Sequence, residues 1–284
     1  MMMLSGMLLL VKIAGESGIA LPEIMFWRQF MPCALVFAGL LVTGGLGRLR
    51  TGRMGRHAVR SVIGTTNMFF VLGSVQLLPL SEATVLNFTT PLFAVLLSAL
   101  WLREKVGPWR SAAVALGMAG VLIIVGFDTA ELPALGVALG IAGAMGGALV
   151  AIQVRQLSRT EEPVRVVFWF SAFGAAFLSP GLLLTATPHD SGQWLLLAGI
   201  GASGLAAQIG MTAALRFGPV SSVVVMDYSQ LFWATLLGWL VYAHLPPAST
   251  WIGAPIIIAA GLVVAWREPR LRRPATNPSS AETD

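Results

Sequence analysis

The stretch GRLRTGRMGRHAVR, from Gly47 to Arg60, carries five arginines in fourteen residues and separates two long apolar segments. Short loops rich in Lys and Arg that join membrane spans stay on the cytoplasmic side of the bilayer. This stretch therefore predicts a membrane protein and fixes the side on which one of its loops lies.

The other basic residues repeat this pattern in every second gap between apolar segments. Of the 18 Lys and Arg residues, all but Lys12 and Arg28 lie in these gaps, and the intervening gaps carry acidic residues or His instead. The basic gaps hold Arg48–Arg60, Arg103–Arg110, Arg155–Arg165, Arg216 and Arg267–Arg273. Ten spans with both termini in the cytoplasm satisfy this alternation, whereas nine or eleven spans place a basic loop on the wrong face.

Composition supports this class and excludes several others. The chain is 56% hydrophobic and 11% charged, whereas a soluble protein carries roughly a quarter of charged residues. The basic residues are spread over loops and form no soluble basic module, so nucleic acid is not an expected partner. With Cys33 as the single cysteine and three dispersed histidines, we expect no disulfide, metal site or cofactor. The N-terminus lacks the features of a removable signal peptide.

The apolar segments predict an all-α membrane protein. The expected spans are 1–14, 24–46, 58–77, 83–102, 109–127, 134–154, 165–186, 194–215, 219–242 and 251–266. A span needs about 20 residues, so the first is short unless it tilts or extends upstream. Pro91 predicts a kink in the fourth span that frees backbone carbonyls. Residues 268–284 are rich in Pro, Ser, Thr and charge, which predicts a disordered cytoplasmic tail.

The two halves of the chain match each other at a nearly constant offset. Adding 141 takes Pro22 to Pro163 and Gly120 to Gly261, and adding 140 takes Pro79 to Pro219. Each half holds five expected spans, so the second half must enter the membrane from the opposite side. The sequence thus predicts two inverted repeats, 1–128 and 134–267, an arrangement that in secondary transporters places the substrate site near the midplane between the repeats. A duplicated bundle without a transport role is the alternative.

The same offset pairs most of the strongly polar residues inside the spans. Lys12 pairs with Gln153, Arg28 with Trp169, Asn67 with Gln208, and Asn87 with Asp227. Asn87 and Asp227 each follow an interfacial proline by eight residues, which is about 12 Å of helix and close to the midplane. We therefore expect Arg28, Asn67, Asn87, Trp169, Gln208, Asp227 and Tyr228 to line a substrate cavity.

Asp227 is the sharpest of these candidates, because a charge at a helix centre costs roughly 2.5–3.5 kcal/mol to insert. It predicts a site for a substrate ammonium or for coupling to protons. The structural alternative is a permanent hydrogen bond to Tyr228, Ser229 or a facing amide. Arg28 and Lys12 are candidates for holding a carboxylate or phosphate, with outward snorkelling to the headgroups as the alternative.

Several segments resemble an EamA domain of the drug/metabolite transporter superfamily. They are LSEATVLNFTTP at Leu80–Pro91, WLREK at Trp101–Lys105 and GMAGVLII at Gly117–Ile124, with FGPVS, LLGWL and WIGA repeating the pattern at Phe217, Leu236 and Trp251. The resemblance implies a ten-helix carrier of two inverted repeats around a central cavity that moves small metabolites such as amino acids. Glu104 fits a family position after the fourth span, whereas His244 occupies its counterpart in the second half.

These observations predict a secondary transporter of small polar metabolites in a bacterial inner membrane, working by alternating access and not as an enzyme, with export the expected direction. A small-molecule substrate and the lipid bilayer are its expected partners; a monomer suffices, and a dimer is compatible. The sequence contains no GxxxxGK[ST] run for ATP. The alternatives are a flippase or scramblase for a lipid-linked substrate and an intramembrane enzyme, which would need facing catalytic pairs inside the spans.

Overall fold

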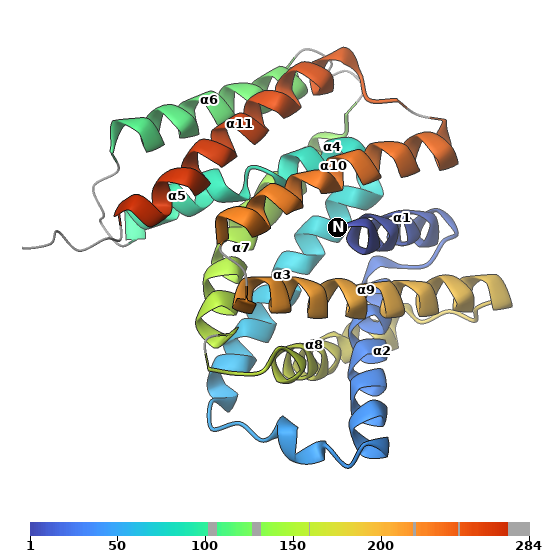
Figure 1. The fold of residues 1–284 in the computed structure, drawn as a ribbon. Coiled ribbons are helices and arrows are strands. Elements are labelled where there is room, and N and C mark those ends of the chain that lie inside the picture. Colours follow the sequence, from blue (N-terminus) through green and yellow to red (C-terminus); the bar gives the residue numbers. More distant parts are fainter. Residues whose placement is uncertain (102–106, 127–131, 159, 218–219, 244, 272–284) are drawn as a thin grey trace, which may run out of the picture.

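In the computed structural model, the described residues are 1–101, 107–126, 132–158, 160–217, 220–243 and 245–271. Within these ranges the chain forms helices and no strand (Figure 1). The helices of the first half are α1 (Met2–Glu16), α2 (Leu21–Val42), η1 (Leu46–Leu49), α3 (Met54–Leu77), α4 (Leu80–Asn87), α5 (Thr90–Trp101) and α6 (Pro108–Gly126). Those of the second half are α7 (Ala134–Ser158), α8 (Pro163–Thr185), α9 (Ser191–Phe217), α10 (Val220–Tyr242) and α11 (Ala248–Leu271).

The all-α class is confirmed, and each expected span corresponds to helix. The second span is shorter than predicted: α2 ends at Val42, and the chain turns through Gly44, whose φ is +68°, before the short 3-10 helix η1. The fourth span is divided into α4 and α5. The tail was predicted to begin at residue 268, but α11 continues to Leu271; Glu104, His244 and the rest of the tail lie outside the described residues.

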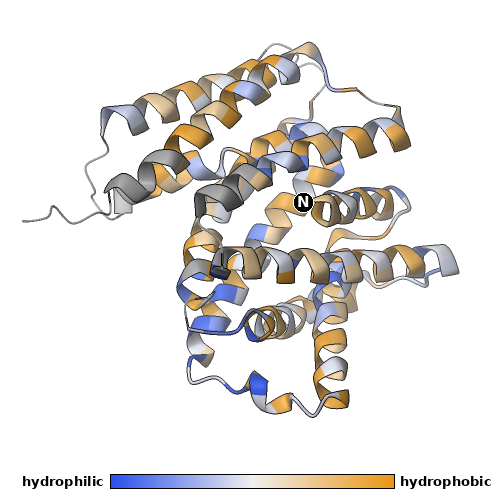
Figure 2. Cartoon of the chain, viewed as in Figure 1, coloured by the Kyte–Doolittle hydropathy of each residue, from blue (hydrophilic) through white to orange (hydrophobic). Residues whose placement is uncertain are grey.

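Length and composition suit a multi-pass membrane protein. Among the described residues, seven helical stretches are long and apolar enough to cross a bilayer, and a shorter apolar helix covers Ser111–Ile124. Large apolar side chains are exposed on the helix surfaces, including Leu183 at 84%, Leu184 at 86% and Val42 at 86%. Figure 2 shows hydrophobic residues along the helices, with hydrophilic residues gathered where α3 and α8 begin. Such exposure suits lipid, which solvates apolar side chains.

Contacts between the two halves organise the bundle. The helix α3 packs against α7 and α1 packs against α9, while α2 packs against both α8 and α9. The helices α6 and α11 lie side by side and contact each other extensively (Figure 1). The main core gathers around α1, the start of α2, the second half of α3, and α4, with Leu197 and Ile200 of α9. Most of these contacts join one half of the chain to the other, so neither half forms its core alone.

Candidate functional site

The break between α4 and α5 is built by proline and threonine. Pro91 lacks the N–H that would bond to the carbonyl of Asn87, so a continuous helix would leave that oxygen unpaired. The Thr90 hydroxyl donates to this carbonyl at 2.6 Å, and the Thr89 hydroxyl donates to the carbonyl of Leu86 at 2.6 Å. The predicted kink is therefore confirmed as a full break, but these two carbonyls are satisfied by the threonines and are not free for a ligand.

Helices α7 and α10 approach this break from the second half. A methyl group at Gly147 of α7 would lie 3.1 Å from the Thr90 hydroxyl, so glycine lets α7 come close. Tyr228 of α10 packs edge-on against Phe88, with ring centroids 5.0 Å apart. The Tyr228 hydroxyl and Oδ1 of Asp227 are buried and have no hydrogen-bond partner. The break thus lies beside a phenol whose hydroxyl has no partner among the described residues.

A cavity of about 200 Å³ lies between α3 and α7. It is lined by Val62, Ile63, Thr66, Asn67, Phe70, Gly146 and Leu149. Asn67 contributes Oδ1, which is buried without a partner, and a side chain at Gly146 would collide with it. The cavity has apolar walls and one polar group, and its volume lies below the roughly 300–1,000 Å³ of ligand-binding pockets.

Of the residues predicted to line a substrate cavity, Asn67 lines the cavity between α3 and α7, which the others do not line. Asn87 ends α4 and donates from Nδ2 to the carbonyl of Ala83 at 3.1 Å. Gln208 is half-buried on α9. Ser229 donates to the carbonyl of Met226 and not to Asp227. The assignment of these residues to a substrate cavity remains a prediction.

Trp169 and Lys12 have structural partners. The indole Nε1 of Trp169 donates to the backbone oxygen of Leu49 at 2.9 Å, which holds η1 against α8. Lys12 donates to the carbonyls of Leu78 at 2.8 Å and Val75 at 3.4 Å, at the C-terminal end of α3. A cation at a helix C-terminus is favoured by the helix dipole. Lys12 is therefore paired without a substrate.

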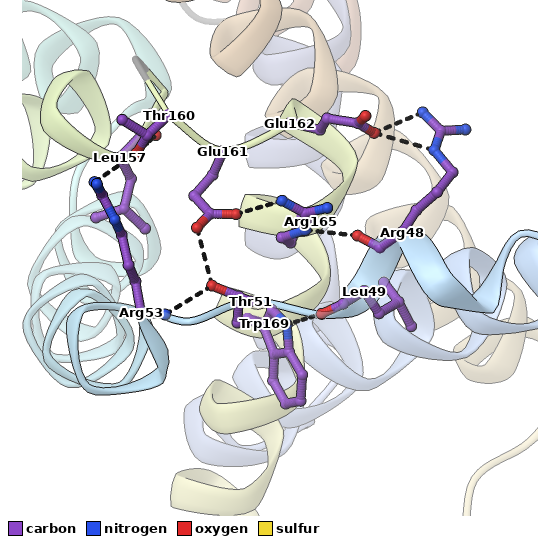
Figure 3. A network of polar contacts seen from close by, with 10 residues as sticks. All are labelled: Arg48, Leu49, Thr51, Arg53, Leu157, Thr160, Glu161, Glu162, Arg165 and Trp169. Carbon is purple, nitrogen blue, oxygen red and sulfur yellow. Dashed lines mark hydrogen bonds and ion pairs between the residues drawn. The ribbon is translucent and has the colours of Figure 1, made fainter.

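A polar network joins the two halves where α2, α3, α7 and α8 end or begin (Figure 3). Arg48 pairs with Glu162 at 2.8 Å, and Arg165 pairs with Glu161 at 2.6 Å. Glu161 also accepts from the Thr51 hydroxyl at 2.9 Å. The arginine-rich loop of the first half is thereby fastened to the α7–α8 loop of the second.

Glu161 is the buried member of this network, with 6% of its surface exposed. Burial by itself would raise the pKa of Glu161, but hydrogen bonds from Arg165 and Thr51, together with the charge of Arg165, hold the pKa below its ordinary value. The carboxylate is therefore charged at neutral pH and is the acceptor around which the loop contacts form.

A smaller polar contact lies at the opposite ends of the same helices. His189, in the α8–α9 connection, lies 2.7 Å from Glu23 at the start of α2, and the two side chains are only 2% and 3% exposed. Gln193 donates to the carbonyl of Ser17 at 3.0 Å. Polar contacts between the halves therefore close both ends of the bundle.

Arg28 and Arg60 are two buried arginines outside this network, and the sequence pointed to only the first of them. Arg28 was expected to be functional, but Arg60 was counted as a loop anchor and is instead buried in α3, with 4% of its surface exposed. The signal for Arg60 was its position inside the expected span 58–77, because a cation inside a membrane span is costly and usually has a partner or a function. The contacts between His189 and Glu23 and around Glu161 were also missed, because the sequence does not show which loops meet.

Comparisons with known proteins agree with this architecture. The model of the EamA-like transporter family matches residues 1–126 and again residues 134–266. The riboflavin transporter of Vibrio cholerae is 32% identical, over 86% of this chain and 83% of its own length. The pseudopaline exporter CntI of Pseudomonas aeruginosa is 27% identical, over 88% of both chains. One solved crystal structure matches with a TM-score of 0.64 at 21% identity, covering 96% of this chain and 98% of its own; that likeness concerns the fold alone.

Proposed function

Because the chain belongs to the EamA-like transporter family and is a multi-pass membrane transporter, we propose that it is a secondary transporter of small polar metabolites in a bacterial inner membrane. Amino acids or related compounds are the proposed substrates, alternating access is the proposed mechanism, and export is the proposed direction. The proposed architecture has ten spans, counting α4 with α5, and two inverted repeats, 1–128 and 134–267.

The observation that carries this proposal is the exchange symmetry of the helix contacts. If α1, α2 and α3 are matched in order with α7, α8 and α9, the contact of α3 with α7 becomes that of α9 with α1. In the same way, the contact between α2 and α9 becomes the contact between α8 and α3. The structure contains both contacts. The pairs α2 with α8 and α6 with α11 map onto themselves. Inverted repeats related by a two-fold axis produce such a pattern, and their interface holds the substrate site in secondary transporters.

The polar contacts at the two ends supply the proposed pair of gates. The network around Glu161 joins the halves at one end, and the contact between Glu23 and His189 joins them at the other. In alternating access, rocking of one repeat against the other opens one end while the second stays closed. We propose that breaking the contacts at one end at a time exposes the cavity residues Asn67, Asn87, Gln208, Asp227 and Tyr228 to the matching side.

Solute exchange in proteoliposomes tests the function. Purified protein is reconstituted and loaded with amino acids, S-adenosylmethionine, nucleobases or riboflavin, with and without a pH gradient. We expect exchange of at least one amino-acid-like compound, and loss of at least 90% of the rate in D227N. Ser111→Ala, at an exposed position on α6, is the matched control and should keep the wild-type rate. Folded protein that exchanges none of these compounds would contradict the proposal.

Cysteine labelling tests the proposed orientation, with both termini in the cytoplasm. Cys33 is the single cysteine, so C33A gives a background without thiols. A cysteine is then introduced by Gly52→Cys in the arginine-rich loop or by Ser191→Cys at the α8–α9 connection. Both positions are exposed. In intact cells we expect an impermeant maleimide to label position 191 and not position 52. The opposite labelling would reverse the orientation, and labelling of both would refute the span count.

A further inference from the structure

Two buried arginines have no acidic partner. Arg28 of α2 is 9% exposed and Arg60 of α3 is 4% exposed, and neither belongs to an ion pair among the described residues. Nε and Nη1 of Arg60 are buried without any hydrogen-bond partner. Arg28 contacts the sulfurs of Met7 and Met68, which are weak acceptors. Leaving a charged donor buried and unpaired is strongly unfavourable, so the arrangement calls for an anion.

Both guanidinium groups lie along the same turn of α3. A side chain at Gly64 would collide with Nη1 of Arg60, so this guanidinium extends along the helix over Gly64. Nη1 of Arg28 contacts Sδ of Met68. Gly64 and Met68 are one turn apart, which is about 6 Å of helix. Two cations therefore converge on one small region of the interior.

The neighbouring unpaired atoms can also donate hydrogen bonds. Nε2 of Gln29 and Oγ1 of Thr65 are buried without partners, and both lie beside Gly174 of α8, where a side chain would displace them. The guanidinium carbon of Arg60 lies over the ring of Phe170, 4.2 Å from the ring centroid. A cation–π contact stabilises the charge of the guanidinium. It leaves the N–H groups, which lie in the guanidinium plane, free to donate to an acceptor.

We propose that Arg28 and Arg60, with Gln29 and Thr65, bind the oxyanion of the transported solute, a carboxylate or a phosphate, where α2 and α3 meet α8 and α9. The inference rests on the proposed transport function and names the chemical class of its substrate. Planar guanidinium groups bind such oxyanions through paired N–H···O bonds, and a dry site strengthens those bonds. Phe170, Met7 and Met68 supply the apolar walls around the polar centre.

Thermal unfolding in detergent tests the site without relying on transport. The full-length protein is heated with acetate, succinate, glutamate, glycerol 3-phosphate or inorganic phosphate, and with glycerol as a neutral control. At about 100 times the Kd, an anion should raise Tm by roughly 5 °C or more. A response to carboxylates alone or to phosphates alone identifies which oxyanion the site takes; either supports the proposal.

The variants separate a binding role from a packing role. R60M removes an unpaired charge and keeps the length of the side chain, so we expect its ligand-free Tm to rise by about 2 °C or more and its anion response to vanish. R60K keeps the charge but loses the planar fork, and its Kd should rise at least tenfold. R56M, which changes an exposed arginine at the start of α3 outside the loop network, is the matched control and should keep the anion response.

Two results would overturn the inference: a wild-type protein that responds to no anion, or an R60M or R60K variant that responds as the wild type does. A fall in the ligand-free Tm of R60M would assign Arg60 to packing. Flux measurements keep the two proposals apart. Exchange of neutral solutes without any response to anions would refute the oxyanion site and leave transport standing, whereas an anion response without exchange of any solute would do the reverse.

Discussion

The close approach of α6 and α11 gives a prediction that depends on single atoms. A methyl group at Gly253 of α11 would lie 2.7 Å from the carbonyl oxygen of Gly120 and 2.5 Å from Cγ1 of Ile124, both in α6. In the reverse direction, a methyl group at Gly120 would lie 3.0 Å from the carbonyl oxygen of Gly253. The two glycines therefore face each other, and G253A should force the helices apart.

The size of the effect follows from which atoms would have to move. Ile124 can change its side-chain conformation, but the Gly120 oxygen is part of a helix and moves only with that helix. Overpacking of this kind costs about 1–3 kcal/mol, and small residues at such contacts are what allows helices to pack closely in lipid. Alanine favours helix over glycine by up to about 1 kcal/mol, so we expect a net destabilisation of roughly 1–2 kcal/mol.

Gly238 of α10 supplies the matched control, because a methyl group there meets no atom within 4 Å. The assay is thermal unfolding of purified protein in one detergent. G238A should leave Tm unchanged or raise it through helix propensity, and G253A should lower Tm by about 2–6 °C. Equal Tm values for G253A and the wild type would show that α6 and α11 do not meet at these glycines.

Three further predictions concern the loop network and the interior acid. Because the pKa of Glu161 is lowered in the folded protein, its carboxylate stabilises the fold above the ordinary carboxylate pKa, and this stabilisation is lost as pH falls through the folded-state pKa. E161Q should therefore lower Tm at pH 7. In acid, the melting curves of E161Q and the wild type should converge. W169F removes the donor to the Leu49 carbonyl and should cost about 1 kcal/mol in chemical denaturation, a value near zero arguing against that bond. D227N should abolish any dependence of solute exchange on a pH gradient, and retained dependence would place proton coupling elsewhere.

The sequence predicts the helices well because their signals are local. Apolar length and charged gaps placed each expected span on helix, and Pro91 with two neighbouring threonines marked the break between α4 and α5. The boundary of α2 was misplaced because no charged residue follows Val42 until Arg48, whereas the turn at Gly44 is set by a positive φ. Hydropathy does not record a backbone conformation that glycine makes accessible.

The partners of polar side chains were less predictable because they depend on which helices meet. Trp169 occupies the repeat position of Arg28, which suggested a shared role in a cavity, but its indole holds η1 through Leu49. The loop arginines were expected to be solvated anchors, yet Arg48 and Arg165 pair with Glu162 and Glu161 across the halves. A repeat offset relates positions within the fold, but the contact that each position makes depends on the facing half.

The unpaired polar groups argue against a bundle whose only role is packing. Among the described residues, Arg28 and Arg60 are buried without an acidic partner, and Oδ1 of Asp227 is buried without a donor. A charge near the centre of a spanning helix costs roughly 2.5–3.5 kcal/mol, and apolar residues of similar volume would often be as stable or more so. Sites that lower stability in this way are typical of function, because a ligand restores the missing partners. A gain of stability in R60M together with a loss of anion binding would demonstrate directly that this site lowers stability in order to bind a ligand.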